Sequence, residues 1–599
     1  MTKFRYSDYL SQFRYPGRKS YDVVSRLRED NWRRDGTTEP EDADPVICAV
    51  RRGDVKELQD LATSSPVSLL KENKDGWIPV HDAAFCGQTE CLKIIMKAHP
   101  GLVDKRTLQE QTSLLLAVSC GHLPCVRCLL ESGADPDISN NNKETALYKG
   151  TAEESVSDVG HENGAAWCSV CAACELENAE MVSLLLSHGA TVNQRCAQGW
   201  TALHEAVARD NTEICDILVG AGAMLNPAHT YSIPPLNVAA QKGHMRALCY
   251  LIDKGASVNM QTCDGTTALH EAAENGHKEV VHALLSKHAD ANKPANSGLL
   301  PLHLAAKYGH HEIVFQLVSV TSRAKLRHSW ISPLHLAAEH NRHAAAAVLL
   351  KAGADVNDTL AHSHSIQYAD GRATPLYFAV ANGSTETAEL LLNAGASLSL
   401  DPVSPLLMAA RQGCVRSASL LLERGADLDA KIPSSSTTFP AVVALCVDNL
   451  PLLRCLLNHG CDALSCFYCT YGRDPHPPPD NNCNILLNER TALMNYNESP
   501  ERTIQFCEWI STPLMCERAG PVLDLLLEHV GQVQLCNKLT ELLDSRDEWH
   551  DVKRKLLSPR PLLHQCRLRI RRQMGRNRLR SIPGLPLPDR LIRYLSLND

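Results

Sequence analysis

The segment DGTTALHEAAENGHKEVVHALLSKHADAN, residues 264–292, contains the signals for two short helices and the turns around them. Asp264-Gly265 predicts a tight turn, because glycine accepts positive φ angles, and Thr267 can cap the helix that follows. Asn275-Gly276 ends that helix. Four apolar residues then recur at helical spacing and predict a second helix: Val280, Val281, Leu284 and Leu285. The segment therefore predicts a unit of two short helices between turns.

Units of this kind return about every 33 residues over most of the 599-residue chain. The positions equivalent to Thr267 are Asp44, Ile78, Thr112, Thr145, Thr201, Pro234, Leu300, Ser332, Thr374, Ser404 and Phe439. A fixed period of this size indicates a solenoid, in which each unit buries its apolar face only against its neighbours. We predict an all-α fold with about 12 repeats, one for each of these positions and Thr267.

The repeated pattern resembles the ankyrin repeat, in which two antiparallel helices carry a projecting hairpin. The same pattern occurs in GWTALH at residues 199–204 and in SPLHLAA at residues 332–338. The resemblance covers residues 44–465, and the first and last repeats are degenerate, as capping units should be. The preceding residues, 1–43, are predicted to form a flexible N-terminal extension.

Histidines at the fourth position of the motif invite a metal or catalytic interpretation. They are His81, His204, His270, His303 and His335. In ankyrin-like repeats this residue hydrogen-bonds neighbouring backbone and ties adjacent hairpins together. A metal site would need its ligands to converge on one point, whereas these histidines are distributed one to a repeat. A structural role is therefore favoured.

Two insertions interrupt the period. Removing residues 150–172 restores an ordinary fourth repeat, so this stretch is a flexible loop, an alternative splice product or an error in predicting the coding sequence. Its cysteine motif, CSVCAAC at residues 168–174, lacks a second pair at a standard finger spacing, which disfavours zinc. The polar stretch at residues 360–371 is expected to project from one face of the solenoid, as a binding loop or a tolerated insertion.

After the last repeat, residues 466–503 are predicted to form a linker, because the segment DPHPPPD within it cannot continue a helix. Three cysteines could contribute to a metal site there: Cys466, Cys469 and Cys483. No set of four ligands is evident, so we expect neither a metal nor a cofactor. Residues 504–555 show helical apolar spacing without the repeat and are predicted to be a helical connecting segment.

The charge of the chain is divided unevenly. The whole chain has a net charge of −8, but residues 556–599 contain ten Arg and two Asp, which indicates a separate basic module. The N-terminal residues lack an uninterrupted apolar stretch, so no secretory signal is expected. The 24 cysteines are scattered through helical positions and are expected to be reduced thiols that pack as small apolar groups. We expect a soluble, cytoplasmic protein that binds no membrane.

The segment PLLHQCRLRI, residues 561–570, predicts a short amphipathic helix in the basic module. Pro561 suits the helix start, where its missing N–H costs nothing. Leu562, Cys566 and Ile570 follow at i, i+4 and i+8 and therefore share one face. A helix this short with such an apolar stripe needs a partner groove.

A second motif, IPGLPLPDRLIRYL, occupies residues 582–595. Taken alone, each motif is ambiguous: Leu-Pro-Leu-Pro could be a polyproline ligand, and the arginines of residues 567–580 could bind nucleic acid or act as an import signal. Together, at this separation and after an ankyrin array, they resemble a SOCS box, made of a BC box (561–570) and a cullin box (582–595). The chain thus resembles the ankyrin repeat and SOCS box family.

The resemblance implies roles for individual residues of a SOCS box at 556–599. Leu562 would fill a pocket of elongin C, with Cys566 and Ile570 packing beside it. A cullin-5 scaffold would be favoured by four residues of the cullin box: Leu585, Pro586, Leu587 and Pro588. The arginines of the BC-box helix would form its solvated face, and no nucleic acid would bind. Residues 480–503 match the family pattern poorly.

These implications describe a non-catalytic substrate receptor of a ubiquitin ligase. The ankyrin surface would bind a protein target, and the SOCS box would recruit elongin B/C and cullin-5 with a RING-finger subunit, leading to ubiquitination and proteasomal degradation. Likeness to one family member at residues 1–9 and 106–110 implies filamin-type actin crosslinkers as targets and a cytoskeletal association. Trp77 and Trp200 are either target-binding anchors or hairpin side chains packed on their neighbours.

Two other classes of protein compete with this interpretation. A plain ankyrin scaffold with a basic tail would leave the apolar stripe of the BC box unexplained. An enzyme built on the histidines and cysteines is disfavoured, because these residues are fixed in repeat positions and the chain shows neither a phosphate-binding loop nor a nucleophile elbow.

Overall fold

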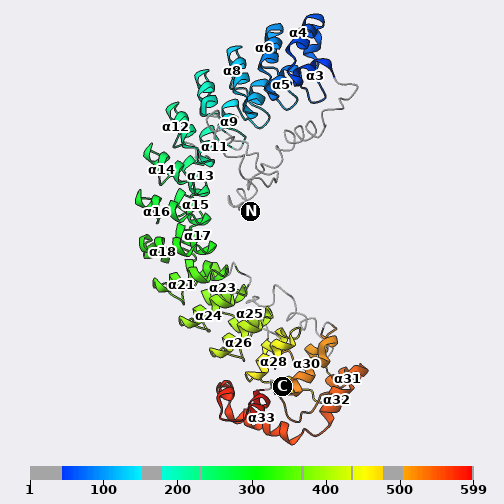
Figure 1. Cartoon of the computed structure of the whole chain (residues 1–599). Coiled ribbons are helices and arrows are strands. Elements are labelled where there is room, and N and C mark those ends of the chain that lie inside the picture. The colour runs from blue at the N-terminus through cyan, green and yellow to red at the C-terminus, as the bar shows by residue number, and fades with distance from the viewer. Residues whose placement is uncertain are drawn as a thin grey trace. The chain divides into compact units, whose positions relative to one another are not determined.

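The computed structural model describes most of the repeats and the C-terminal module (Figure 1). The described residues are 44–151, 179–197, 199–227, 233–365, 368, 370–432, 436–476, 503–513 and 515–596. The chain divides after Ser297 into two compact units, Met1–Ser297 and Gly298–Asp599. Within the described ranges, no helix is both long and apolar enough to cross a membrane.

Three of the sequence predictions concern residues outside these ranges. They are the N-terminal extension 1–43, residues 152–172 of the insertion and residues 477–502 of the linker. Residues 150 and 151 of the insertion are described, as the end of a helix. The cysteines of the insertion and Cys483 of the linker therefore have no described position.

The first unit is a stack of short helices, paired within each repeat (Figure 1). The helices are α3 (Pro45–Arg52) with α4 (Val55–Ser64), α5 (Pro79–Phe85) with α6 (Thr89–Ala98), α7 (Ser113–Ser119) with α8 (Leu123–Glu131), α9 (Ala146–Thr151), a helix over residues 179–187, α11 (Ala202–Ala208) with α12 (Thr212–Gly220), α13 (Pro235–Lys242) with α14 (Met245–Asp253), and α15 (Ala268–Asn275) with α16 (Lys278–Ser286). Two 3₁₀ turns, η1 (Pro66–Leu70) and η2 (Pro100–Leu102), follow α4 and α6. First helices of neighbouring repeats pack on each other, as α5 does on α7.

The second unit continues with five more helix pairs of the same kind (Figure 1). They are α17 (Pro301–Tyr308) with α18 (His311–Val320), α20 (Pro333–Glu339) with α21 (His343–Lys351), α23 (Pro375–Ala381) with α24 (Thr385–Asn393), α25 (Pro405–Arg411) with α26 (Val415–Glu423), and α27 (Ala441–Leu445) with α28 (Leu450–Asn458). Two additional short helices, α19 (Arg323–His328) and α22 (His362–Ser365), lie between pairs. Among the described residues the fold is all-α, as predicted.

The predicted repeat positions coincide with helix starts. The hydroxyls of Thr112 and Thr374 each accept the backbone N–H three residues ahead, at 3.2 Å, which satisfies one of the free donors of the first turn. Ile78 has no side-chain oxygen, and there the cap comes from His81, whose Nδ1 accepts the N–H of Ile78 at 3.1 Å. The motif therefore supplies a cap even where the threonine is replaced.

The motif histidines also link each repeat to the next. The Nε2 of His81 donates to the carbonyl of Lys105 (2.9 Å), 24 residues further along the chain. Equivalent bonds to the following repeat are made by His204, His303 and His335. His81, His204 and His303 thus each cap their own helix and satisfy a carbonyl of the next repeat, which supports the structural interpretation of the motif histidines.

Burial keeps these imidazoles neutral. With Nδ1 accepting an N–H and Nε2 donating to a carbonyl, the ring has the tautomer without charge. Burial lowers the pKa of His81 and of His204 to about 4. A proton added at Nδ1 would face the backbone N–H that this atom now accepts, so protonation breaks the cap.

Part of the polar insertion at 360–371 packs into the fold instead of projecting as predicted, whereas Ala361 and Ser363 are exposed. Leu360 and Asp370 are buried, and the ring of Tyr368 meets the edge of Phe378 with ring centroids 5.1 Å apart. The apolar side chains within the insertion give it a surface to bury, so it packs back on the repeat that follows.

Beyond the repeats, short helices complete the second unit. They are η3 (Leu464–Phe467), α29 (Phe506–Ile510), η5 (Cys516–Arg518), α30 (Ala519–Leu527), α31 (Asn537–Asp544), η6 (Asp547–Trp549), α32 (His550–Leu557), α33 (Leu562–Met574), η7 (Arg576–Gly584) and α34 (Asp589–Ser596). Phe506 and Trp509 of α29 are fully buried and lie against Phe439 at the start of the last repeat, with ring centroids 5.3 and 5.6 Å apart. Helix α29 therefore covers apolar surface that a further repeat would otherwise bury.

Two arginines of α33 point into this unit, whereas the sequence placed all arginines of the helix in solvent. Arg567 and Arg571 are only 7% and 8% exposed. Arg571 donates to the carbonyl of Leu595 (2.7 Å) and to that of Asn458 (2.6 Å), near the ends of α34 and α28. Arg567 donates to the carbonyl of Glu528 (3.3 Å). Carbonyls in the last turn of a helix lack partners, and the guanidinium fork supplies several donors at once, so these arginines anchor α33.

We expect Arg571→Ala to loosen this anchorage. The substitution leaves buried carbonyls without a donor, at an expected cost of about 2–3 kcal/mol, and hydrogen exchange should accelerate across α33 and α34. Arg572→Ala is the matched control, since Arg572 is adjacent and exposed. Equal exchange protection in the two variants would show that Arg571 does not anchor the helix.

We expect the first unit to lose stability as the pH falls from about 6.5 to about 4. The unfolded chain binds protons on His81 and His204 near pH 6.5, whereas the folded chain does so only near pH 4, so the folded state is fully favoured above this window. The loss amounts to about 3 kcal/mol for each histidine. Urea unfolding at a series of pH values measures it.

The variant His204→Gln should show a shallower pH dependence, because an amide can accept and donate in place of the ring without titrating. His282→Gln, at an exposed histidine of the same unit, should behave as the unaltered chain does. An unchanged slope in His204→Gln would contradict the assignment.

Candidate functional site

The outward face of α33 is apolar. Leu562 is 77% exposed, Ile570 is 42% exposed, and Cys566 between them is also exposed. Leu563, at the start of the same helix, adds a further exposed side chain. The stripe predicted from the i, i+4, i+8 spacing therefore lies on the surface of the described chain.

The polarity of α33 is reversed relative to an ordinary surface helix, which turns its apolar face to the core. Its inward face carries Arg567 and Arg571, and also His564, whose Nε2 donates to the carbonyl of Val530 (3.0 Å). Burial lowers the pKa of Arg571 only to about 10, so this side chain stays charged at neutral pH. The buried polar anchors fix the helix in one orientation. The stripe of Leu562, Cys566 and Ile570 is thereby held at the surface.

The cullin-box motif forms a small module beside α33. Leu579, Ile582 and Leu595 are its buried core, and Leu585 and Ile592 pack against them. The remaining motif residues, Pro586, Leu587 and Pro588, are exposed. The four residues predicted to bind a cullin therefore differ in burial. Leu585 packs against the core of the module, while the three that follow are exposed to solvent.

The rigid segment after Leu585 presents these residues. The N–H of Leu587 donates to the carbonyl of Leu585 (2.7 Å), which closes a tight turn, and the two prolines restrict φ on either side. Helix α34 then begins at Asp589. Leu587 therefore closes the turn centred on Pro586 and has little freedom to lose on binding.

The two tryptophans occupy different environments. Trp77 is 8% exposed and packs edge-on against Phe85 with ring centroids 5.4 Å apart, so it has little surface to offer a target. Its position is that of a hairpin side chain packed on its neighbours. Trp200 is half-buried, near His204 (ring centroids 5.9 Å apart), and keeps part of its ring accessible.

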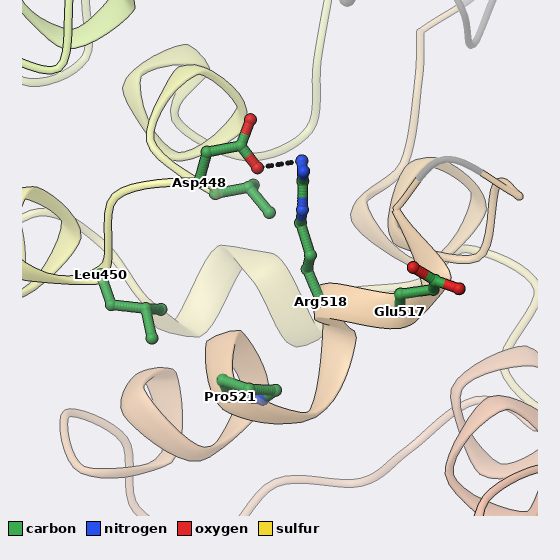
Figure 2. A pocket seen from close by; sticks show the side chains of 6 residues that line it. Asp448, Leu450, Glu517, Arg518 and Pro521 are labelled. Carbon is green, nitrogen blue, oxygen red and sulfur yellow. Dashed lines mark ion pairs between the residues drawn. The ribbon is translucent and has the colours of Figure 1, made fainter.

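An open hollow of about 300 Å³ lies between the last repeat and α30 (Figure 2). It is lined by Val447, Asp448, Leu450, Glu517, Arg518 and Pro521. Arg518 forms an ion pair with Asp448, as Figure 2 shows. These lining residues provide no pairing of a nucleophile with a base, so the hollow is a seam between two parts of the unit.

One group of side chains in the described ranges is suited to holding a metal ion: Cys469, His476, Cys507 and Cys536. From the sequence, Cys469 was considered with Cys466 and Cys483, without a fourth ligand. Among the described residues Cys469 lies instead with His476 of the same loop, Cys507 of α29 and Cys536 at the start of α31, while Cys483 lies outside the described residues. Spacings of 6, 30 and 28 intervening residues match no common finger pattern, so sequence spacing gave no signal.

Comparisons with known proteins match both parts of the chain. Ankyrin repeat models match residues 109–141, 151–229, 223–295, 288–360 and 334–432, and the SOCS box model matches residues 558–596. A human relative, ankyrin repeat and SOCS box protein 2, is 50% identical over 562 residues, which cover 93% of this chain and 83% of the relative. The mouse protein of the same name is 50% identical over 556 residues with the same coverage. Mouse ankyrin repeat and SOCS box protein 14 is 34% identical over 281 residues, 46% of each chain.

These similarities extend from the repeats to the module that carries the outward apolar face of α33. Their coverage of the relatives named protein 2 is well above two thirds of each chain. The chain therefore belongs to the ankyrin repeat and SOCS box family.

Proposed function

We propose that the chain is the substrate-recognition subunit of an elongin–cullin–SOCS-box ubiquitin ligase built on cullin-5. The observation that carries the proposal is the exposed stripe of Leu562, Cys566 and Ile570 on α33. In a chain without a partner this stripe exposes apolar surface to water at a cost that grows with its area. A groove on elongin C removes that cost.

The stripe is shaped for such a groove. Leu562 is the first residue of α33 and its side chain is more exposed than that of Ile570, so it can enter a pocket while the next turns lie along the groove. The anchors Arg567 and Arg571 hold the helix from behind, so binding need not order it. Elongin C with elongin B is the partner that the family resemblance implies.

Cullin-5 is proposed as the scaffold on the basis of the cullin box. Pro586, Leu587 and Pro588 are exposed on the turn next to α33. A cullin bound there would touch elongin C and this chain together, so two weak contacts would support each other. A RING-finger subunit on the cullin would then bring the ubiquitin-charged conjugating enzyme.

The chain itself supplies no chemistry in this proposal. The reactive thioester belongs to the conjugating enzyme, and the assembly accelerates transfer by holding target lysines near it, which replaces a bimolecular encounter by a positioned one. The motif histidines are occupied in caps and repeat contacts, which is consistent with a binding protein.

The ankyrin surface is proposed to bind the target protein, with filamin-type actin crosslinkers implied by the resemblance. Trp200 is the better of the two tryptophan candidates, because part of its ring is accessible. Trp77 could contact a target only through the small part of its ring that is exposed. Ubiquitination would lead such targets to the proteasome, in the cytoplasm and at the cytoskeleton.

The double variant Leu562→Ala/Cys566→Ala tests the elongin contact. Truncating buried anchors at an interface typically costs 2–4 kcal/mol, so the affinity for elongin B/C measured by calorimetry should fall about 30- to 1,000-fold. Leu557→Ala is the matched control, because Leu557 is 75% exposed but lies on α32, outside the stripe. Unchanged elongin binding by the folded double variant would show that the stripe is not the elongin contact, and absence of elongin binding by the unaltered chain would favour a plain ankyrin scaffold.

Substituting Leu587 by Ala tests the choice of cullin. Because Leu587 is exposed and held by the rigid turn that it closes, its truncation should weaken binding of cullin-5 to the preformed complex with elongin B/C roughly tenfold, leaving elongin affinity intact. Biolayer interferometry with cullin-5 and cullin-2 in parallel gives the comparison. Equal binding of both cullins by the unaltered complex would contradict the assignment to cullin-5.

A further inference from the structure

Four metal-ligating side chains converge where the repeat array meets the connecting segment. The two sulfurs of Cys507 and Cys536, the sulfur of Cys469 and a ring nitrogen of His476 all lie within 4.8 Å of one another. Cys469 and His476 belong to the loop after η3, Cys507 lies in α29, and Cys536 is the N-cap of α31. All four residues belong to the second unit.

The separations between ligand atoms fit a tetrahedral site. Zn–S bonds of about 2.3 Å and Zn–N bonds of about 2.05 Å place two sulfurs about 3.8 Å apart, and a sulfur about 3.5 Å from a nitrogen. The Cys469 and Cys507 sulfurs are 3.7 Å apart, and the Cys507 sulfur is 3.5 Å from Nε2 of His476. The Cys469 sulfur and Nε2 of His476 are closer, at 3.1 Å.

The surrounding hydrogen bonds hold the loop in place. Gln505, the N-cap of α29, accepts the N–H of Thr470 (2.9 Å) and donates to its hydroxyl (2.7 Å). On the other side, the N–H of Asn537 donates to the carbonyl of Gly472 (3.2 Å). The loop that carries Cys469 is therefore fixed to both helices that carry the other thiols. Such outer contacts are what orient the ligands of a metal site.

The burial of the group indicates which kind of site it is. Cys507 and Cys536 are buried, while Cys469 and His476 are half-buried. Three thiols and one imidazole complete a tetrahedron and leave no position for a substrate or water, which distinguishes a structural site from a catalytic one. Soft sulfur ligands in tetrahedral geometry select zinc over magnesium or calcium.

We propose that Cys469, His476, Cys507 and Cys536 bind one structural Zn²⁺. The ion would join the loop after the last repeat to α29 and α31, two helices too short to be stable alone. It would thereby fasten the connecting segment to the end of the repeat array. In the same segment, the turn after α30 carries the carbonyls of Glu528 and Val530 that Arg567 and His564 bind, so the ion would support the position of α33.

A disulfide is the competing use of the same atoms. Cys469 and Cys507 are both free thiols in this structure, with sulfurs at a separation close to that of zinc ligands and well beyond an S–S bond of about 2.0 Å. A disulfide would also leave Cys536 and His476 without a role. Zinc uses all four side chains.

Zinc content is the first test. The full chain, purified under reducing conditions without chelator, should contain about one zinc per molecule by inductively coupled plasma mass spectrometry, and cobalt substitution should give the intense visible bands of tetrahedral thiolate coordination. Cys469→Ser and His476→Gln, chosen because both positions are half-buried, should each retain less than a tenth of the zinc after dialysis against a weak chelator.

Cys516→Ser is the matched control, because Cys516 lies nearby in η5, is half-buried and is outside the group. It should keep its zinc. Circular dichroism establishes that each variant is folded. A folded unaltered chain without zinc, a folded Cys469→Ser variant that keeps it, or a disulfide between Cys469 and Cys507 found by peptide mapping would each overturn the proposal.

The readout is independent of ligase assembly, since zinc is measured on the chain without elongin or cullin. A chain that binds zinc but not elongin B/C would contradict the proposed function alone. A chain that binds elongin B/C but holds no zinc would contradict this inference alone.

Discussion

No single repeat of this chain can bury its own apolar face, and the rest of the structure follows from that constraint. Two helices of five to ten residues make one apolar side that only a neighbouring pair can cover. The motif histidine couples the pairs further, because one ring caps its own helix and satisfies a carbonyl of the next repeat. Its neutrality is part of the same arrangement, since a charged ring could not accept the capping N–H.

The last repeat of such an array has an apolar face that no further repeat covers, so another element must cover it. Here Phe506 and Trp509 cover the last repeat, and the polar anchors Arg567 and Arg571 attach α33 beyond them. The two attachments differ in kind. The aromatic contact removes apolar surface from water, whereas the arginines fix direction, so that α33 keeps its leucines outward.

The repeat positions, the helix starts and the apolar stripe could all be predicted from the sequence, because each depends on local spacing. The inward arginines could not, since their partners are backbone carbonyls more than a hundred residues away in the case of Asn458. The sequence of the insertion at 360–371 is mostly polar. Its side chains Leu360 and Tyr368 nevertheless pack against the repeat that follows. The Cys469 group escaped prediction for a similar reason, because its ligands meet only through the packing of three segments.

One anchor of α33, Arg571, binds main-chain oxygens of the last repeat, and this has a consequence for how such proteins can diverge. Arg571 requires of α28 only that a helix end there with its carbonyls free, whatever its side chains are. The recognition surface of the repeats can therefore drift from one family member to another without disturbing the attachment. A single adaptor module can in this way be inherited unchanged by receptors with unrelated targets.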